Sequence, residues 1–177
     1  AESTKVVIST VGPFAKFGTP VVHACVEAGT DYCDITGEVH WIRRVIDAYE
    51  ARAHATGARI VHCCGYDSIP SDLGVRMLYE EARGRDLQLT RVRFVVGRTK
   101  GSFSGGTVAS MLALVAEMKE RPETARVVAD PYALDPVGSK RGEDGPDSLH
   151  VDYDEDLGEW TAPFVMAAIN TRIVRRS

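Results

Sequence analysis

The sequence has no glycine-rich phosphate loop. Neither Gly-x-Gly-x-x-Gly nor the Lys-containing phosphate loop occurs in its 177 residues, although 16 of them are glycine. In a doubly wound α/β domain that loop follows the first strand and binds the pyrophosphate of a dinucleotide. The chain also begins at Ala1 without a methionine and enters an apolar strand within a few residues. These absences predict a fragment of a longer protein, without the first half of a cofactor domain.

Long hydrophobic runs and an excess of positive charge are also missing. The apolar runs have the length of strands and are interrupted by Gly, Pro or charged residues, which argues against a membrane span or a signal peptide. With 21 basic and 25 acidic residues the formal net charge is −4. Without a basic stripe, nucleic-acid binding is not expected. We expect a cytoplasmic protein, either soluble or associated with a membrane surface.

Metal-binding and nucleophile motifs are absent as well. The four cysteines, Cys25, Cys33, Cys63 and Cys64, lack the usual spacing of zinc ligands. We therefore expect small core residues and no bound metal. Ser68 lies outside a Gly-x-Ser-x-Gly elbow, and no histidine has a fixed spacing to it, so hydrolase chemistry has little support.

Three β-α units are expected in the first 83 residues. The apolar run Val6–Thr10 is typical of a parallel strand buried on both faces. Thr19 is expected to cap the first helix, with Pro20 at its first position and Gly29 at its end. Further strands are expected at 30–36 and 58–64, and further helices at 39–55 and 70–83. The helix at 39–55 is expected to end at Gly57 and to have one apolar face, made of Trp41, Ile42, Val45, Ile46 and Tyr49. This alternation predicts an α/β fold, the second half of a Rossmann-like, doubly wound parallel sheet.

The pattern changes after Gly84. Leu87–Val96 alternates like a half-solvated antiparallel strand, and Thr107–Lys119 repeats apolar residues at helical spacing. Residues 135–159 have few aliphatic side chains, which predicts a long exposed loop. We therefore divide the chain in two. Residues 1–83 would be the C-terminal half of a dinucleotide-binding domain, and residues 84–177 the start of a mixed α+β substrate or dimerisation domain.

Three polar turns that contain glycine are predicted where these strands end. They are Ser9–Phe14, Asp34–Glu38 and Gly65–Pro70. Ligands of doubly wound folds bind at the carboxyl ends of the strands, so the turns predict a ligand site. In the first turn Gly12 would let a flat cofactor ring approach the backbone. Gly12 and Pro13 are equally typical of a plain tight connection.

The side chains of these turns include candidates for catalysis. Tyr66 and Asp67 could transfer protons, and Glu38 could bind a substrate cation or a ribose hydroxyl. Ordinary structural interpretations also apply, because a boundary tyrosine often keeps its hydroxyl in water. Asp72 is expected to cap the helix that follows Pro70.

Together the turns resemble those of the saccharopine dehydrogenase-like oxidoreductases. The matching segments are Thr10–Phe14, Gly29–Glu38 and Cys64–Asp72. Two further segments, Gly105–Ala109 and Asn170–Ser177, are similar to the actinobacterial trans-acting enoyl reductase branch of that family. The resemblance spans nearly all of the chain but only the central part of a family member.

This resemblance implies an NADP(H)-dependent oxidoreductase, with NAD(H) as the alternative cofactor. It implies reduction of a double bond in a polyketide-derived lipid intermediate, a small-molecule or lipid substrate that a polyketide synthase would present. By motif alignment, Tyr66 and Asp67 would be catalytic, and Glu38 and Ser68 would bind substrate. The cofactor-binding residues would be Thr10, Val11, Gly12, Pro13, Thr36, Gly37 and Gly65.

Two other functions remain compatible with the sequence. The protein could be a non-catalytic Rossmann-like binding or scaffold module, since a fold does not fix a function. It could also be an imine reductase that acts on an amino acid or a polyamine, for which acidic pocket residues would be the sign. Because pyrophosphate binding depends on the missing loop, we expect the fragment itself to be inactive. Its exposed sheet edge predicts either self-association into a homo-oligomer or disorder of the fragment.

Overall fold

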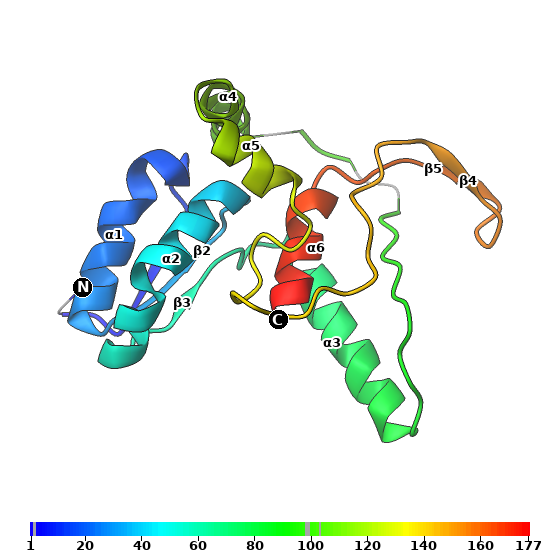
Figure 1. Cartoon of the computed structure of the whole chain (residues 1–177), viewed down its shortest axis with the longest axis horizontal. Coiled ribbons are helices and arrows are strands. Elements are labelled where there is room, and N and C mark those ends of the chain that lie inside the picture. The colour runs from blue at the N-terminus through cyan, green and yellow to red at the C-terminus, as the bar shows by residue number, and fades with distance from the viewer. Residues whose placement is uncertain (2, 98–99, 103) are drawn as a thin grey trace.

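The computed structural model describes residues 1, 3–97, 100–102 and 104–177. β1, β2 and β3 form a parallel sheet in that order, and β4 and β5 form an antiparallel hairpin (Figure 1). In chain order the elements are β1 (Val6–Ser9), α1 (Phe14–Ala28), β2 (Asp31–Asp34), α2 (Val39–Thr56), β3 (Ile60–Val61), α3 (Ile69–Gly84), α4 (Gly105–Glu120), α5 (Pro122–Ala129), β4 (Asp152–Asp154), β5 (Glu159–Thr161) and α6 (Ala167–Arg176).

The parallel sheet confirms the predicted alternation of strands and helices in the first part of the chain. Val7 of β1 pairs with Tyr32 of β2, which in turn pairs with Ile60 of β3. Helices α1 and α2 pack side by side against the sheet (Figure 1). The arrangement is a mixed α/β structure, consistent with part of a Rossmann-like fold.

The main core lies under α1 and α2. Val22 and Val26 of α1 are fully buried, and Trp41 and Ile42 of α2 are nearly so. Gly18 makes this packing possible, because a Cβ atom at that position would lie 2.5 Å from Cζ2 of Trp41. The apolar face predicted for α2 is therefore confirmed as its buried face.

Only one face of the sheet is covered, so the prediction that Val6–Thr10 is buried on both faces is wrong. Ile8 is 72% exposed, and Val6 and Val61 are also exposed. Their side chains point away from the face that α1 and α2 cover, since side chains alternate along a strand. Apolar residues alone did not reveal which face another layer would cover.

Helix α1 begins six residues before the predicted start. Its first residue is Phe14, and Pro20 lies inside the helix. The Glu38 carboxylate accepts hydrogen bonds from the Phe14 and Ala15 N–H groups, so a residue far along the sequence satisfies the helix start. The hydroxyl of Thr19 instead accepts a hydrogen bond from Nε1 of Trp41.

The predicted helix ends are correct, and the predicted start of α3 is nearly so. Gly29 and Gly57 follow α1 and α2 with left-handed φ values of 64° and 79°. Helix α3 begins at Ile69, with Ser68 at the N-cap position. Asp72 lies within its first turn, so the prediction that Asp72 caps this helix is wrong.

The predicted strand at 87–96 is not a strand. The segment follows α3 without regular structure and runs toward the hairpin of β4 and β5 (Figure 1). Arg93 pairs with Asp154 and Asp156 of that hairpin through its guanidinium group. Alternation favours a strand only where another strand can take up its backbone hydrogen bonds.

The region 135–159, predicted as a loop, is mostly exposed loop but includes β4. Arg172 and Arg175 of α6 pair with Asp147 and Asp144 of this region. Guanidinium groups of α6 also donate to the backbone carbonyls of Val128, Pro131 and Leu134. No helix among the described residues is long and apolar enough to cross a bilayer.

Candidate functional site

The three predicted turns meet at the carboxyl-terminal edge of the parallel sheet, here called the rim. Glu38, which is 6% exposed, joins the second turn to the first. Its two carboxylate oxygens accept hydrogen bonds from the N–H groups of Phe14 and Ala15, both at 2.8 Å. Ser110 of α4 donates to Oε1 at 2.9 Å. Glu38 therefore holds α1 and α4 at one side of the rim.

Asp34 joins the second turn to the third. Its side chain is fully buried, and Oδ1 accepts hydrogen bonds from the N–H groups of Thr36 at 3.0 Å and Cys63 at 3.2 Å. Oδ2 lies 2.7 Å from Nδ1 of His62. The Cys63 thiol adds a contact of 2.9 Å to the Thr36 carbonyl. A buried carboxylate of this kind fixes the relative position of the two turns.

The pair of Asp34 and His62 was not predicted from the sequence. The His62 ring packs edge-on against Trp41 and Tyr32, with ring centroids 5.1 and 6.2 Å apart. Nε2 of His62 and the Tyr32 hydroxyl have no hydrogen-bond partner among the described residues. Burial, and then the Asp34 charge, raise the pKa of Tyr32 well above its usual range. Tyr32 therefore stays neutral, as its apolar surroundings require.

One signal in the sequence could have revealed part of this pair. Tyr32 and Asp34 occupy alternate positions of one strand and so share its inward face. An aspartate on the buried face of a strand requires partners, which the following turns supply. The choice of His62 as a partner depends on a bulge after β3, where Cys63 has a φ of 60°.

The residues predicted to bind a cofactor lie at the rim with unequal exposure. Thr10 and Val11 are exposed, whereas Gly12 and Pro13 are half-buried. Thr36 is buried, with its hydroxyl accepting a hydrogen bond from the Glu38 N–H group at 3.1 Å. The others in the set, Gly37 and Gly65, are exposed and half-buried respectively.

The two predicted proton donors are open to solvent. Tyr66 is 89% exposed and Asp67 is exposed as well. The turn that contains both residues is held by Asn170 of α6, whose Nδ2 donates to the Asp67 carbonyl at 2.8 Å. A proton donor at this position would act from the surface of the described part of the chain.

Ser68, predicted to bind substrate, is buried beneath the same turn. Its hydroxyl donates to Oδ1 of Asn170 at 2.8 Å, and Asn170 also donates to the Ser71 hydroxyl at 3.2 Å. Asn170 was not singled out from the sequence as a site residue. It connects α6 to α3 and so supports the third turn of the rim.

Two helix N-termini near the rim are partly occupied. The α1 N-terminus, where a phosphate would be expected to bind, already donates two N–H groups to Glu38. At the α4 N-terminus the Ser104 side chain accepts from the Thr107 N–H. A Cβ atom at Gly12 would make only ordinary contacts of 3.5 Å with the Phe14 ring and the Ser110 hydroxyl, so the packing there does not require a glycine.

The cysteines are all reduced, and only two match the expected core role. Cys25 and Cys63 are buried, whereas Cys33 and Cys64 are half-exposed. Among the described residues, no cluster of three or more His, Cys, Asp or Glu side chains has the arrangement of a metal site.

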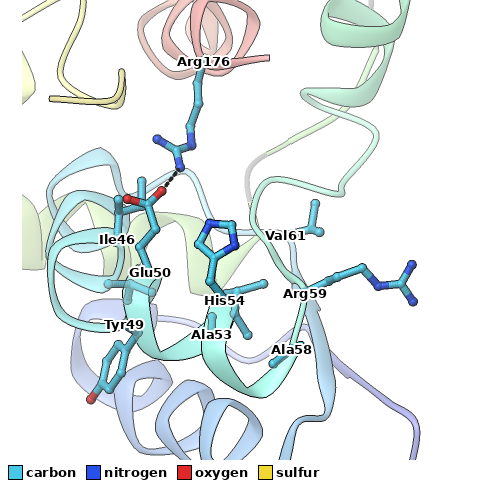
Figure 2. Close-up of a pocket in the computed structure, with 12 residues that line it drawn as sticks. Ile46, Tyr49, Glu50, Ala53, His54, Ala58, Arg59, Val61 and Arg176 are labelled. Carbon is cyan, nitrogen blue, oxygen red and sulfur yellow. Dashed lines mark hydrogen bonds and ion pairs between the residues drawn. The ribbon is translucent and has the colours of Figure 1, made fainter. Parts of the chain in front are cut away.

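A separate groove lies away from the rim, at the amino-terminal end of β3. It has a volume of about 420 Å³ and is bordered by α2, β3 and the end of α6. Figure 2 shows Glu50 and Arg176 facing each other across it, with an ion pair of 3.0 Å between them. Much of its remaining wall is apolar, including Ile46 and Val61.

Comparisons with known proteins give similarity over the whole chain. It is 47% identical over 184 residues to a candidate trans-acting enoyl reductase of Mycobacterium tuberculosis. It is 43% identical over 189 residues to a protein of Mycobacterium bovis, and 42% identical over 185 residues to one of Mycobacterium ulcerans. Both of these are named trans-acting enoyl reductase.

Each alignment covers 100% of this chain but 44% of the relative. The chain thus spans less than half the length of the curated relatives that it matches. No family model matches the chain, and no solved structure matches it.

Proposed function

We propose that this chain is the central part of an enoyl reductase of the saccharopine dehydrogenase-like group, which uses NADP(H) to reduce a carbon–carbon double bond. The observation that carries the proposal is the similarity of the whole chain, at 42–47% identity, to relatives named trans-acting enoyl reductase. The rim supports it, because three turns converge where ligands of doubly wound sheets bind.

The residues of the rim would position the reactants. Thr10–Gly12 would present an open stretch of backbone to the nicotinamide ring, and the bound cofactor would supply the hydride. Glu38 and Asp34 keep the turns in place through the hydrogen bonds described above. Tyr66 and Asp67 are the candidates for delivering the proton that completes reduction of the double bond.

Glu38 favours an apolar substrate over a cationic one, although Asp67 is an exposed carboxylate of the same rim. Glu38, which lies with Asp34 in the second turn, is buried and already accepts three hydrogen bonds. It therefore has little capacity to bind an amine, which an imine reductase of amino acids or polyamines would require. The exposed side chain of Val11 and the apolar surface of α4 suit a lipid intermediate instead.

The test is a calorimetric titration with NADPH and with NADH. The 177-residue chain would be measured beside the full-length M. tuberculosis relative. We expect the relative to bind NADPH and the chain to bind far more weakly, because the chain has no glycine-rich phosphate loop and Glu38 already accepts from two N–H groups at the start of α1. If neither protein binds either cofactor, the reductase proposal fails and a non-catalytic scaffold role becomes the better explanation.

A Tyr66→Phe substitution, made at the equivalent position of that relative, tests the proton donor. An unchanged reduction rate would remove Tyr66 from the role and leave Asp67 as the candidate. The matched control is the equivalent of Tyr79→Phe, since Tyr79 of α3 is also exposed but lies outside the rim.

A further inference from the structure

The two half-exposed cysteines, Cys33 and Cys64, lie beside each other on neighbouring segments. Cys33 of β2 pairs with Val61 of β3, and the Cys64 N–H donates to the Asp34 carbonyl at 2.7 Å. The Cys64 thiol turns back toward β3, with Sγ 3.6 Å from the Val61 carbonyl oxygen. It therefore lies over the residue that pairs with Cys33.

Both cysteines are next to Val61. Cys33 lies opposite Val61 at the spacing of neighbouring strands, about 4.8 Å, and the Cys64 sulfur lies against the Val61 carbonyl. A disulfide also requires the two Cα atoms to be roughly 4.4–6.8 Å apart. Burial raises the pKa of Cys64 above its usual value of 9.0, and the adjacent Cys33 raises it further.

Reagents can reach this pair from the open face of the sheet. Both thiols are half-exposed, and the apolar neighbours Ile8, Ile35 and Val61 on that face are exposed as well. The remaining cysteines, Cys25 and Cys63, are buried and so provide internal controls.

We propose that Cys33 and Cys64 form a reversible intramolecular disulfide by exchange with a low-molecular-weight disulfide such as glutathione disulfide. One thiolate attacks glutathione disulfide and releases one glutathione thiolate, and the second then attacks the resulting mixed disulfide and releases the other. The two protein thiols lose two electrons and two protons in total, and glutathione disulfide is reduced to two glutathione molecules. This inference does not depend on the proposed function.

The disulfide would act on the rim. Cys64 directly precedes the third turn, Gly65–Pro70, and Cys33 directly precedes Asp34. A covalent bond between them would tie the third turn to β2 at the point where Asp34 already holds both. Oxidation would thus limit the movement of the turn that contains Tyr66 and Asp67.

The experiment is to incubate the 177-residue chain with glutathione disulfide, then count free thiols after denaturation and measure the intact mass. The expected result is the loss of two of the four thiols and of two hydrogen atoms, reversed by dithiothreitol. Tryptic mapping alone cannot identify the pair, because peptides 17–43 and 60–76 each contain two cysteines.

Variants therefore identify the bond. Cys33→Ser and Cys64→Ser should each abolish it, whereas Cys25→Ala and Cys63→Ala should keep it. Circular dichroism would show that each variant is folded, and a folded double variant that retains only Cys33 and Cys64 should lose both free thiols. The proposal is overturned if the wild-type chain keeps four free thiols or if its oxidation yields only glutathione adducts. It is also overturned if the Cys25→Ala or Cys63→Ala variant no longer forms the disulfide.

Discussion

Most of the buried apolar side chains lie within residues 14–63, whereas residues 105–176 leave more of theirs exposed and bury an arginine. In the first region Val22, Val26 and Trp41 are almost inaccessible to solvent. In the second, α4 has no buried residue among those described, and its Met111 and Leu112 are exposed. The comparison shows that the same apolar periodicity produces a core only where a second element lies opposite.

A buried arginine adds to the few apolar core residues around α6, such as Ile169 and Leu134. Arg172 is fully buried, and its guanidinium donates to the carbonyls of Val128, Asp130 and Ala168. It also pairs with Asp147 at 2.8 Å. Buried cations are tolerated when every donor has a partner, and this geometry comes close to that condition.

The largest expected effect comes from breaking this arginine network. Arg172→Met should lower the free energy of unfolding by about 3 kcal/mol, because it leaves buried carbonyl groups and one carboxylate without their partner. Chemical denaturation followed by circular dichroism would measure the change. As a control, Arg93→Ala removes an exposed arginine and should cost less than about 1 kcal/mol. Equal losses in the two variants would contradict the view that buried arginines order this region.

An intermediate effect is expected from crowding the apolar core of the first region. Gly18→Ala would place a Cβ atom 2.5 Å from Trp41, so it should destabilise the protein by roughly 1–3 kcal/mol. Gly74→Ala is the matched control. Gly74 lies in α3 with nothing within 4 Å of an added Cβ, and alanine there should stabilise by up to about 1 kcal/mol. Thermal unfolding would show opposite shifts, and shifts of the same sign would refute the packing argument.

The smallest expected effect concerns His40, which lies between the two regions. Nε2 of His40 is 3.6 Å from Glu117 of α4, and Arg44 pairs with the same carboxylate. Burial lowers the pKa of His40 below its usual value of 6.5, despite the opposing effect of Glu117. His40 therefore binds a proton more readily in the unfolded chain than in the folded chain. Its contribution to the free energy of unfolding is fully present above pH 6.5 and is lost as the pH falls.

A pH series of denaturation curves would test this. His40→Gln should flatten the dependence below about pH 6.5, by up to about 1.4 kcal/mol per pH unit. His150→Gln, at an exposed position, should leave the slope unchanged. Glu117 also has a lowered pKa, because the hydrogen bonds from Arg44 and Thr124 outweigh the effect of its burial. Its contribution is lost only at lower pH, below the usual value of 4.5.

The parts of the fold that were predicted correctly depend on local features. The apolar spacing of α2 and the glycines at 29 and 57 predicted helix faces and ends, because these signals lie within one or two turns of where they act. The start of α1 was missed because its N–H groups are satisfied by Glu38, 24 residues away. Apolar and polar residues alternate at 87–96 as they would in a strand, but among the described residues no strand pairs with this segment.

The candidate site, like the fold, was only partly predictable from the sequence. The sequence predicted that three polar turns would meet at one edge of a parallel sheet, since the carboxyl ends of parallel strands share an edge. It did not reveal the contact of Asp34 with His62 or that of Ser68 with Asn170. The latter joins residues 102 positions apart, and no local pattern encodes such a distance.

By itself, the sequence determined the order of strands and helices in residues 1–84, most of their ends, and the turns that form the rim. Only the tertiary structure decided which side chains of those turns are buried. Glu38 and Ser68 became internal supports, whereas Tyr66 remained exposed. The physical reason is that secondary structure follows from backbone preferences and short-range periodicity. Burial and hydrogen-bond partners are instead set by elements that meet only after the chain has folded.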